Sequence, residues 1–424
     1  MSALIFTFLE LVSFIAFYII EKKIFSFSNS LIEQNKILNL VPESNSVNTF
    51  ADISTQPIMI HPYLGYVYNP DTKENKEKIL RGEQGLIVNQ YGFMDDRDPI
   101  QKKSKDSLLI GITGGSVAFY FSIKGNNALI RELKKHPKFV DKNIQIVRFA
   151  LGGFKQPQQL MALNYLLSIG SEFDILINID GFNEAALPVS ENIPANIFPL
   201  YPRNWFQQTG YQSDVEFFSI MGKVAIEKEF RKEITMKFMQ SPLKYSITAN
   251  LLLTRYYNYK AKIISKLEFQ MLTYMHSGQK AERSFLTGPS FAKEKEKINS
   301  FIVSSWLQSS LLMHSISGGS NLNYFHILQP NQYLPNSKIL SENEKKYAFI
   351  EGNHSYKSAI EDIYPSMRES GKIFIEKGVN FKDLTMLFVE NPETIYEDNC
   401  CHLNLKGNEI LGEAIGKFIV SKVK

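Results

Sequence analysis

Short apolar runs separated by helix-length stretches are the feature that most limits how this chain can fold. The runs cover residues 108–113, 144–149, 174–180 and 324–328. A strand buried on both faces of a sheet reads as a continuous apolar run, and two parallel strands need a long crossover that is usually a helix. The pattern therefore predicts an α/β domain with a central parallel sheet between two layers of helices.

The region from about residue 185 to 318 interrupts this alternation. It begins with an aromatic, proline-containing segment and continues with long helical stretches at 215–240 and 242–275. We interpret 185–318 as a helical insertion over one edge of the sheet. Its apolar residues recur at helical spacing, which is typical of core packing, and a lid or membrane-facing cap is the alternative. Further helices are expected at 357–377 and 405–420.

The N-terminal segment 3–20 is almost entirely apolar. About 20 helical residues cross the ~30 Å hydrocarbon layer of a bilayer, so residues 1–21 are predicted to form a transmembrane anchor. No basic segment precedes the run and no small-residue cleavage site follows it, which disfavours a cleaved signal peptide. A buried core helix is the alternative. Glu10 is costly in lipid and indicates either a protein neighbour or a shallow insertion.

The segment after the apolar run, residues 22–60, is rich in Ser and Asn and shows no sustained period. Such a composition is typical of a linker or stalk, and the domain itself is expected over 61–424. Lys22 and Lys23 follow the span while nothing basic precedes it, so the positive-inside rule would leave the domain in the cytoplasm. That rule is a bias, and the orientation stays open.

Charge and cysteine usage exclude several classes of partner. The 424 residues include 47 Lys and Arg against 43 Asp and Glu, a net charge of +4 that gives no sign of a nucleic-acid partner. Both cysteines of the chain, Cys400 and Cys401, are adjacent and cannot form a disulfide framework. They precede His402, but no second Cys/His pair has ligand spacing, so we predict neither a metal site nor a cofactor.

A Gly-Gly-Ser turn follows the first apolar run. The segment 108–118 reads as a buried strand that ends in Gly114 and Gly115 and passes into a helix at Ser116. Open α/β sheets place their sites at the carboxyl ends of strands, and a helix N-terminus directs N–H groups at negative charge. Ser116 is therefore a candidate nucleophile. Phosphate-binding loops share such turns, but this one lacks the Gly-Lys-Ser/Thr ending of a P-loop.

Two later loops offer hydrogen-bond donors at the same edge of the sheet. Residues 151–159 follow the second apolar run and include Gly153, and residues 179–184 follow the third and include the Asn183 amide. An oxyanion hole needs donors that converge from separate loops. The backbone N–H groups of Ser116 and Gly153, with the Asn183 side chain, are predicted to form one.

The C-terminal segment 396–408 places His402 just after acidic and amide residues and before the last expected helix. A serine hydroxyl needs a neighbouring base to take its proton, and a carboxylate usually holds that base. His402 is the candidate base and Asp398 its candidate acid. The remaining histidines show no paired spacing and are interpreted as structural or surface residues: His61, His136, His276, His314, His326 and His354.

These four blocks, in this order, resemble the SGNH/GDSL hydrolase family. A serine follows the first strand, a glycine the second and Gly-x-Asn the third, and an Asp-His element precedes the last helix. The resemblance implies a flavodoxin-like three-layer fold. It also implies roles for Ser116 as nucleophile, for His402 as base, and for Ser116, Gly153 and Asn183 as oxyanion donors.

The resemblance covers most of residues 61–184 and 324–424, and the anchor and the insertion lie outside it. The anchor, a His-Pro-Tyr-Leu-Gly opening and a Gln-Pro-Asn-Gln-Tyr segment also look like membrane-anchored bacterial members of the family. One departure concerns the acid. The family commonly has it three residues before the histidine, where this chain has Asn399, whereas Asp398 lies four before.

The activity that the resemblance implies is hydrolysis of an ester bond through a serine acyl-enzyme. The substrate would be an acylated small molecule or polysaccharide, with an acetyl ester of a cell-envelope carbohydrate and a periplasmic domain as the expected case. An O-acyltransferase would use the same acyl-enzyme and stays open. A membrane-tethered binding or scaffold protein that has lost turnover also stays open, although the complete residue set argues against it.

Overall fold

The chain divides into two compact units, which we describe one at a time. One unit consists of Met1–Gln56 with Gly210–Lys280, and the other of Pro57–Thr209 with Ala281–Lys424. The computed structural model describes residues 2–38, 58–72, 86–95, 97–205, 215–276 and 287–423.

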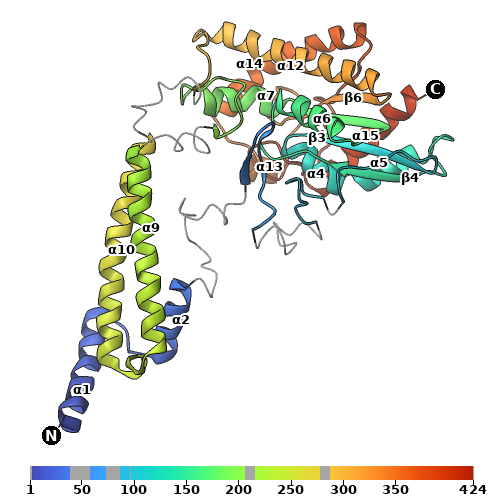
Figure 1. The fold of residues 1–424 in the computed structure, drawn as a ribbon. Coiled ribbons are helices and arrows are strands. Elements are labelled where there is room, and N and C mark those ends of the chain that lie inside the picture. Colours follow the sequence, from blue (N-terminus) through green and yellow to red (C-terminus); the bar gives the residue numbers. More distant parts are fainter. Residues whose placement is uncertain are drawn as a thin grey trace. The chain divides into compact units, whose positions relative to one another are not determined.

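A five-stranded parallel sheet forms the centre of the larger unit, which confirms the predicted α/β class (Figure 1). The strands lie in the order β4-β3-β5-β6-β7. They are β3 Ser107–Gly114, β4 Asn143–Arg148, β5 Ile175–Asp180, β6 Asn323–Leu328 and β7 Asn380–Asp383. The four apolar runs coincide with β3 to β6. The edge strand β7 was not predicted, because Phe381 is its one apolar residue and the strand contains no continuous apolar run.

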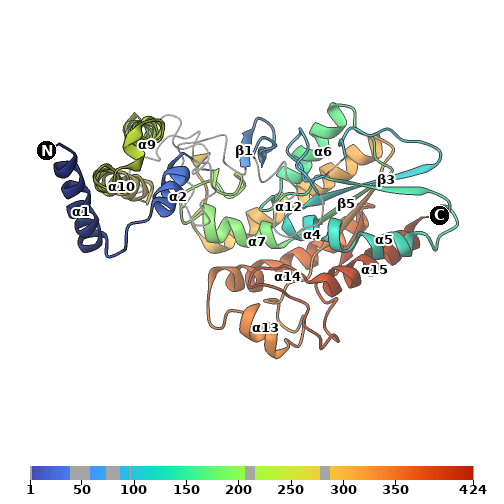
Figure 2. The ribbon, with the colours of Figure 1, turned by 90° about the horizontal axis from the view of Figure 1, so that it is seen from below.

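Helices cover both faces of the sheet, as the alternation predicts (Figure 1 and Figure 2). On one face lie α4 Ser116–Lys124, α5 Asn126–Leu133 and α15 Leu405–Lys422. On the other lie α6 Gln158–Ser168, α12 Lys295–Gly319 and α14 Ser355–Glu376. The apolar side chains between these layers make one continuous core. The helices expected at 357–377 and 405–420 correspond to α14 and α15.

The predicted insertion is too long. Helix α12 packs against β6, α6 and α14, and it buries Ile302, Trp306 and Met313 in the α/β core. Only residues 210–280 of the predicted 185–318 leave the larger unit. The sequence interpretation failed here because α12 is the crossover helix before β6, and its helical period resembles that of the helices before it in the chain.

A small antiparallel hairpin precedes the sheet in the larger unit. It consists of β1 Ile58–His61 and β2 Gly65–Tyr68. The Tyr66 hydroxyl donates to the Gly152 carbonyl at 2.8 Å, which fastens the hairpin to the loop after β4. The larger unit thus includes residues shortly before His61, where we expected the domain to start.

The smaller unit is helical and contains α1 Ser2–Glu21, α2 Phe27–Ile37, α9 Val215–Gln240 and α10 Ile247–His276. Helices α9 and α10 form an antiparallel hairpin, with α1 against α10 and α2 against α9 (Figure 1). The carboxylate of Glu10 accepts hydrogen bonds from the Ser246 hydroxyl at 2.6 Å and the Ile247 N–H at 2.5 Å. Glu10 therefore has a protein neighbour, which is one of the two explanations that we gave for a carboxylate in an apolar helix.

Helix α1 is long and apolar enough to cross a membrane, and its span Leu4–Glu21 is only 6% buried. The segment 22–60, interpreted as a stalk, differs from the expectation because it contains α2. That helix mixes polar residues with Phe27, Leu31, Ile32 and Ile37, and it lies in a segment with no sustained apolar period. Its Gln34 amide instead bonds Asn250 of α10 at 3.2 Å. The rest of the predicted stalk, up to residue 57, lies outside the described residues.

Candidate active site

Ser116 stands at the first position of α4, directly after the glycine turn that ends β3. Gly114 has a φ of +141°, and a Cβ atom there would lie 2.1 Å from the Ile179 carbonyl oxygen of β5. A Cβ atom on Gly115 would lie 2.1 Å from Nδ2 of Asn183. The two glycines therefore let the turn enter the space between the ends of β3 and β5. The strand order reverses there, so the carboxyl ends form the crevice where open α/β sheets bind ligands.

A continuous chain of hydrogen bonds joins Ser116, His402 and Asp398. Nε2 of His402 lies 2.7 Å from the Ser116 Oγ, and Nδ1 lies 2.5 Å from Oδ2 of Asp398. With Nδ1 protonated, the imidazole donates to the carboxylate and accepts from the serine hydroxyl, which is the tautomer that a general base needs. The ring of Tyr120, one turn along α4, packs edge-on against the His402 ring and limits its rotation. The two ring centroids lie 5.0 Å apart.

Backbone N–H groups of residues 400–402 keep the side chain of Asp398 ionised. Its Oδ1 accepts the backbone N–H groups of Cys400, Cys401 and His402 at 3.0, 3.2 and 3.3 Å. Burial raises the pKa of Asp398, but the hydrogen bonds with His402 and with the backbone N–H groups outweigh it and lower the pKa to about 2. This tight turn explains why an acid four residues before the histidine reaches the ring in place of Asn399.

The segment after β6 supports the same loop from behind. Gln332 Nε2, Tyr333 Oη and Asn331 Nδ2 donate to the successive carbonyl oxygens of residues 398–400, at 2.9, 2.7 and 3.2 Å. The three donors are buried. Sequence reasoning singled out this Gln-Pro-Asn-Gln-Tyr segment but assigned it no role. Three polar residues directly after a buried strand were the signal that could have revealed these positioning residues.

The predicted oxyanion loops meet at Gly115. Nδ2 of Asn183, in the first turn of helix α7 Phe182–Leu187, donates to the Phe154 carbonyl oxygen at 2.7 Å. That oxygen would lie 3.2 Å from a Cβ atom on Gly115. An amide nitrogen carries two hydrogens, so Asn183 keeps one for a ligand. Gly153, with a φ of +80°, lies immediately before Phe154 in the same loop.

A buried carboxyl group, Glu184, joins the two loops. One of its oxygens accepts from the Gly181 N–H at 2.7 Å, and the other from the Gln156 N–H at 2.9 Å and the Gln159 amide at 2.8 Å. Burial, together with the charge of Asp180, raises the pKa of Glu184 to about 8. Sequence reasoning missed this residue, although an acid beside Asn183 among buried neighbours was a visible signal.

A second Ser-His-Asp chain exists in the core. Nε2 of His326 lies 2.8 Å from the Asp180 carboxylate, and Nδ1 lies 2.8 Å from the Ser310 hydroxyl. Trp306 also donates to Asp180, at 2.8 Å. The side chains of His326 and Asp180 have an exposed fraction of 0%. No substrate can reach them, and His326 is a core residue, in keeping with its structural interpretation.

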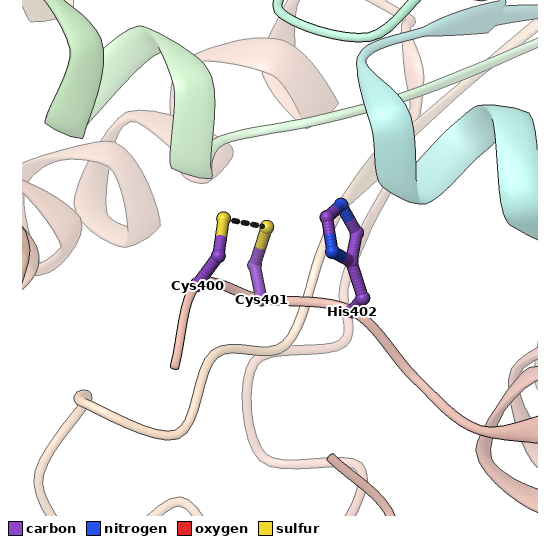
Figure 3. A group of neighbouring side chains, drawn as sticks. All are labelled: Cys400, Cys401 and His402. Atoms are coloured by element: carbon purple, nitrogen blue, oxygen red, sulfur yellow. Dashed lines mark hydrogen bonds between the residues drawn. The ribbon is translucent and has the colours of Figure 1, made fainter. Parts of the chain in front are cut away.

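The two cysteines lie beside the candidate base. Cys400, Cys401 and His402 point their side chains to the same side of the loop, and the two sulfur atoms lie 2.8 Å apart (Figure 3). The potential ligand atoms of the three residues all lie within 4.8 Å of one another, so they could hold a soft metal ion. Both ring nitrogens of His402 already have protein partners, Asp398 and Ser116.

No model of a protein family matches the chain, and no curated protein matches its sequence. The function of this chain is therefore inferred from the geometry of its site.

Proposed function

We propose that this protein is a serine esterase of the SGNH type with Ser116 as its nucleophile. The hydrogen-bonded chain from Ser116 through His402 to Asp398, with distances of 2.7 and 2.5 Å, carries the proposal. Ser116 lies where the strand order of the sheet reverses, which is where open α/β sheets bind their ligands. This position supports a catalytic role over a scaffold role. Counted along the chain, the parallel strands have the order 2-1-3-4-5, which is that of flavodoxin-like sheets.

The reaction begins when His402 takes the proton of Ser116 and the serine oxygen attacks the ester carbonyl. Asp398 stays ionised and stabilises the imidazolium that forms. His402 then gives the proton to the departing alcohol, which leaves an acyl group on Ser116. Water attacks this acyl-enzyme with His402 again as base, the carboxylic acid departs, and the hydroxyl is restored.

The negative charge of the tetrahedral intermediate would be stabilised by three donors. They are the backbone N–H of Ser116 at the start of α4, the backbone N–H of Gly153, and the free N–H of the Asn183 amide. Donors that are fixed before the reaction lower the barrier without reorganising. Glu184 supports this arrangement because it bonds both loops that carry the last two donors.

The substrate class that we propose is a short acyl ester, with an acetylated cell-envelope carbohydrate as the natural case. Helix α1 would anchor the enzyme to the membrane beside such a polymer. Release of acetate from an acetylated polysaccharide, compared with transfer of acetate to an added glycan, separates hydrolysis from acyl transfer. Acetate in solution supports the esterase.

The first prediction concerns Ser116→Ala. Loss of the nucleophile should lower kcat for p-nitrophenyl acetate by more than ~10³-fold, because the base and the oxyanion donors alone retain little catalysis. The matched control is Ser168→Ala, which changes an exposed serine that bonds only its own helix. Unchanged hydrolysis by folded Ser116→Ala, in a preparation free of other esterases, would refute the proposal.

A further inference from the structure

The pair Cys400 and Cys401 has no task in the mechanism, yet it occupies the centre of the loop that carries Asp398 and His402. The two thiols are free. Cys400 is partly exposed and Cys401 is buried, with 1% of its surface accessible. The backbone N–H groups of both cysteines donate to Oδ1 of Asp398, at 3.0 and 3.2 Å. The pair is therefore bound to the acid through its backbone, and Cys400 is accessible to solvent.

The distance between the sulfur atoms indicates which chemistry suits the pair. Two thiolates on one tetrahedral zinc ion, each about 2.3 Å from the metal, lie roughly 3.8 Å apart. The sulfur atoms of Cys400 and Cys401 lie 2.8 Å apart (Figure 3). A disulfide bond is about 2.0 Å long, so the pair is closer to bond formation than to joint ligation of a metal.

We propose that Cys400 and Cys401 form a reversible oxidation site that closes to a vicinal disulfide by exchange with an external disulfide. The thiolate of the accessible Cys400 attacks one sulfur of the external disulfide and releases one thiol. The Cys401 sulfur then attacks the mixed disulfide on Cys400 and releases the second. The two cysteine protons end on the two released thiols, and the two electrons that reduce the external disulfide come from the pair.

The oxidised pair changes the loop that positions the base. Most disulfides join residues whose Cα atoms lie about 4.4 to 6.8 Å apart, whereas neighbouring Cα atoms in a chain lie about 3.8 Å apart. Ring closure must therefore rotate the peptide between the cysteines. That peptide supplies the Cys401 N–H, which donates to Asp398 at 3.2 Å. Misalignment of Asp398 and His402 should follow, a consequence that depends on the proposed esterase function.

The test of the site itself counts thiols and needs no activity. The full-length protein in detergent is incubated with oxidised glutathione, unfolded, and labelled with a maleimide before mass measurement. We expect both labels to disappear, with no glutathione retained and no dimer. Cys401→Ser, which keeps the accessible Cys400, should retain one glutathione. A stable glutathione adduct on the unaltered chain, or two thiols that stay free, would overturn the proposal.

The activity measurement tests the coupling to the catalytic loop. Oxidised protein should lose at least about tenfold in kcat and recover it with dithiothreitol. The paired change Cys400→Ser and Cys401→Ser should abolish the response to oxidised glutathione, whatever its starting rate. Oxidation without a change in rate would refute the coupling. A chain that oxidises as expected but hydrolyses no ester in either state would refute the esterase and leave the oxidation site intact.

Discussion

Burial separates two chemically similar sets of residues in this protein. Ser116 with His402, and Ser310 with His326, each form a serine-histidine hydrogen bond that continues to an aspartate. The His402 side chain has an exposed fraction of 21%, whereas that of His326 is 0%. Catalysis requires access by substrate and water, so only the first set can act as a nucleophile and base. The second holds β5, β6 and α12 together.

The second prediction compares the same substitution in both sets. His402→Gln should lower kcat by more than ~10³-fold with little change in stability, because the ring is partly exposed and its loss removes the base. His326→Gln should instead lower the free energy of unfolding by about 1–3 kcal/mol, because buried polar groups lose their partners. Urea unfolding and kcat per folded molecule measure the two effects. The reverse pattern would mean that the sites are wrongly assigned.

The third prediction concerns the acid. The pKa of Asp398 lies at about 2, below its ordinary value of 3.8, so the folded state binds this proton more weakly than the unfolded state. The stability that Asp398 contributes is therefore complete above pH 3.8 and disappears as the pH falls through about 2. Asp398→Asn should remove that part of the pH dependence in unfolding measurements between these limits.

The same variant should lower kcat by about 10³–10⁴-fold, because the amide favours the wrong tautomer of His402. Asp398 is ionised at every pH where the enzyme would work, so the acid limb of the rate profile should not follow the titration of Asp398. A limb in the unaltered enzyme that tracks the titration of Asp398 would contradict the assignment.

At the scale of elements, the loop before α15 depends on a segment that follows β6. Asn331, Gln332 and Tyr333 bond the carbonyl groups of residues 398–400, so the acid and the base are held from a neighbouring strand end. Burial raises the pKa of Tyr333 to about 12, and its hydroxyl therefore stays protonated and able to donate. The loop is positioned by these contacts and has no regular structure of its own.

The fourth prediction removes one of these contacts. Tyr333→Phe should lower kcat several-fold to about tenfold with little change in KM, because a hydrogen bond worth about 0.5–1.5 kcal/mol aligns the loop and does not touch the substrate. The control is Tyr347→Phe, at a side chain that is 63% exposed. A rise in KM at constant kcat would instead place Tyr333 in substrate binding.

At the scale of the whole molecule, the N-terminal helix belongs to a helical unit and is not an isolated anchor. Glu10 bonds the start of α10, and Glu21 at the other end bonds the Asn258 amide at 3.3 Å. The two helices therefore run side by side in the same direction. The hydroxyls of Ser13 and Thr248 meet between them at 2.9 Å.

The fifth prediction tests this pairing in the full-length protein. In a chain whose native cysteines are replaced by serine, Ser13→Cys with Thr248→Cys should form a disulfide on mild oxidation, seen as a mobility shift on a non-reducing gel. The control pair is Phe14→Cys with Thr248→Cys, because Phe14 is 39% exposed and points elsewhere. Equal cross-linking of both pairs would show that α1 does not keep this register.

The sequence by itself was enough to predict the α/β class and four of the five strands of the sheet. It was also enough to propose the residues of the site. Apolar runs, glycine turns and helical periods are local patterns, and burial of a strand or a helix face can be inferred from a few neighbouring residues. The apolar character of α1 was equally local. The edge strand β7 was not predicted because half-exposed strands are less apolar, and α2 was not predicted because its apolar residues stand among polar ones without a sustained period.

The tertiary structure decided the contacts between distant residues. Ser116 and His402 are separated by 286 positions, and only packing of α4 against the loop before α15 makes them partners. Packing also places Asp398, and not Asn399, against His402, and it makes α12 part of the core. It brings Asn331, Gln332 and Tyr333 to the loop of residues 398–402. A hydrogen bond depends on positions within a few tenths of an ångström. Such positions depend on how the whole core packs, and a local sequence pattern carries no information about that packing.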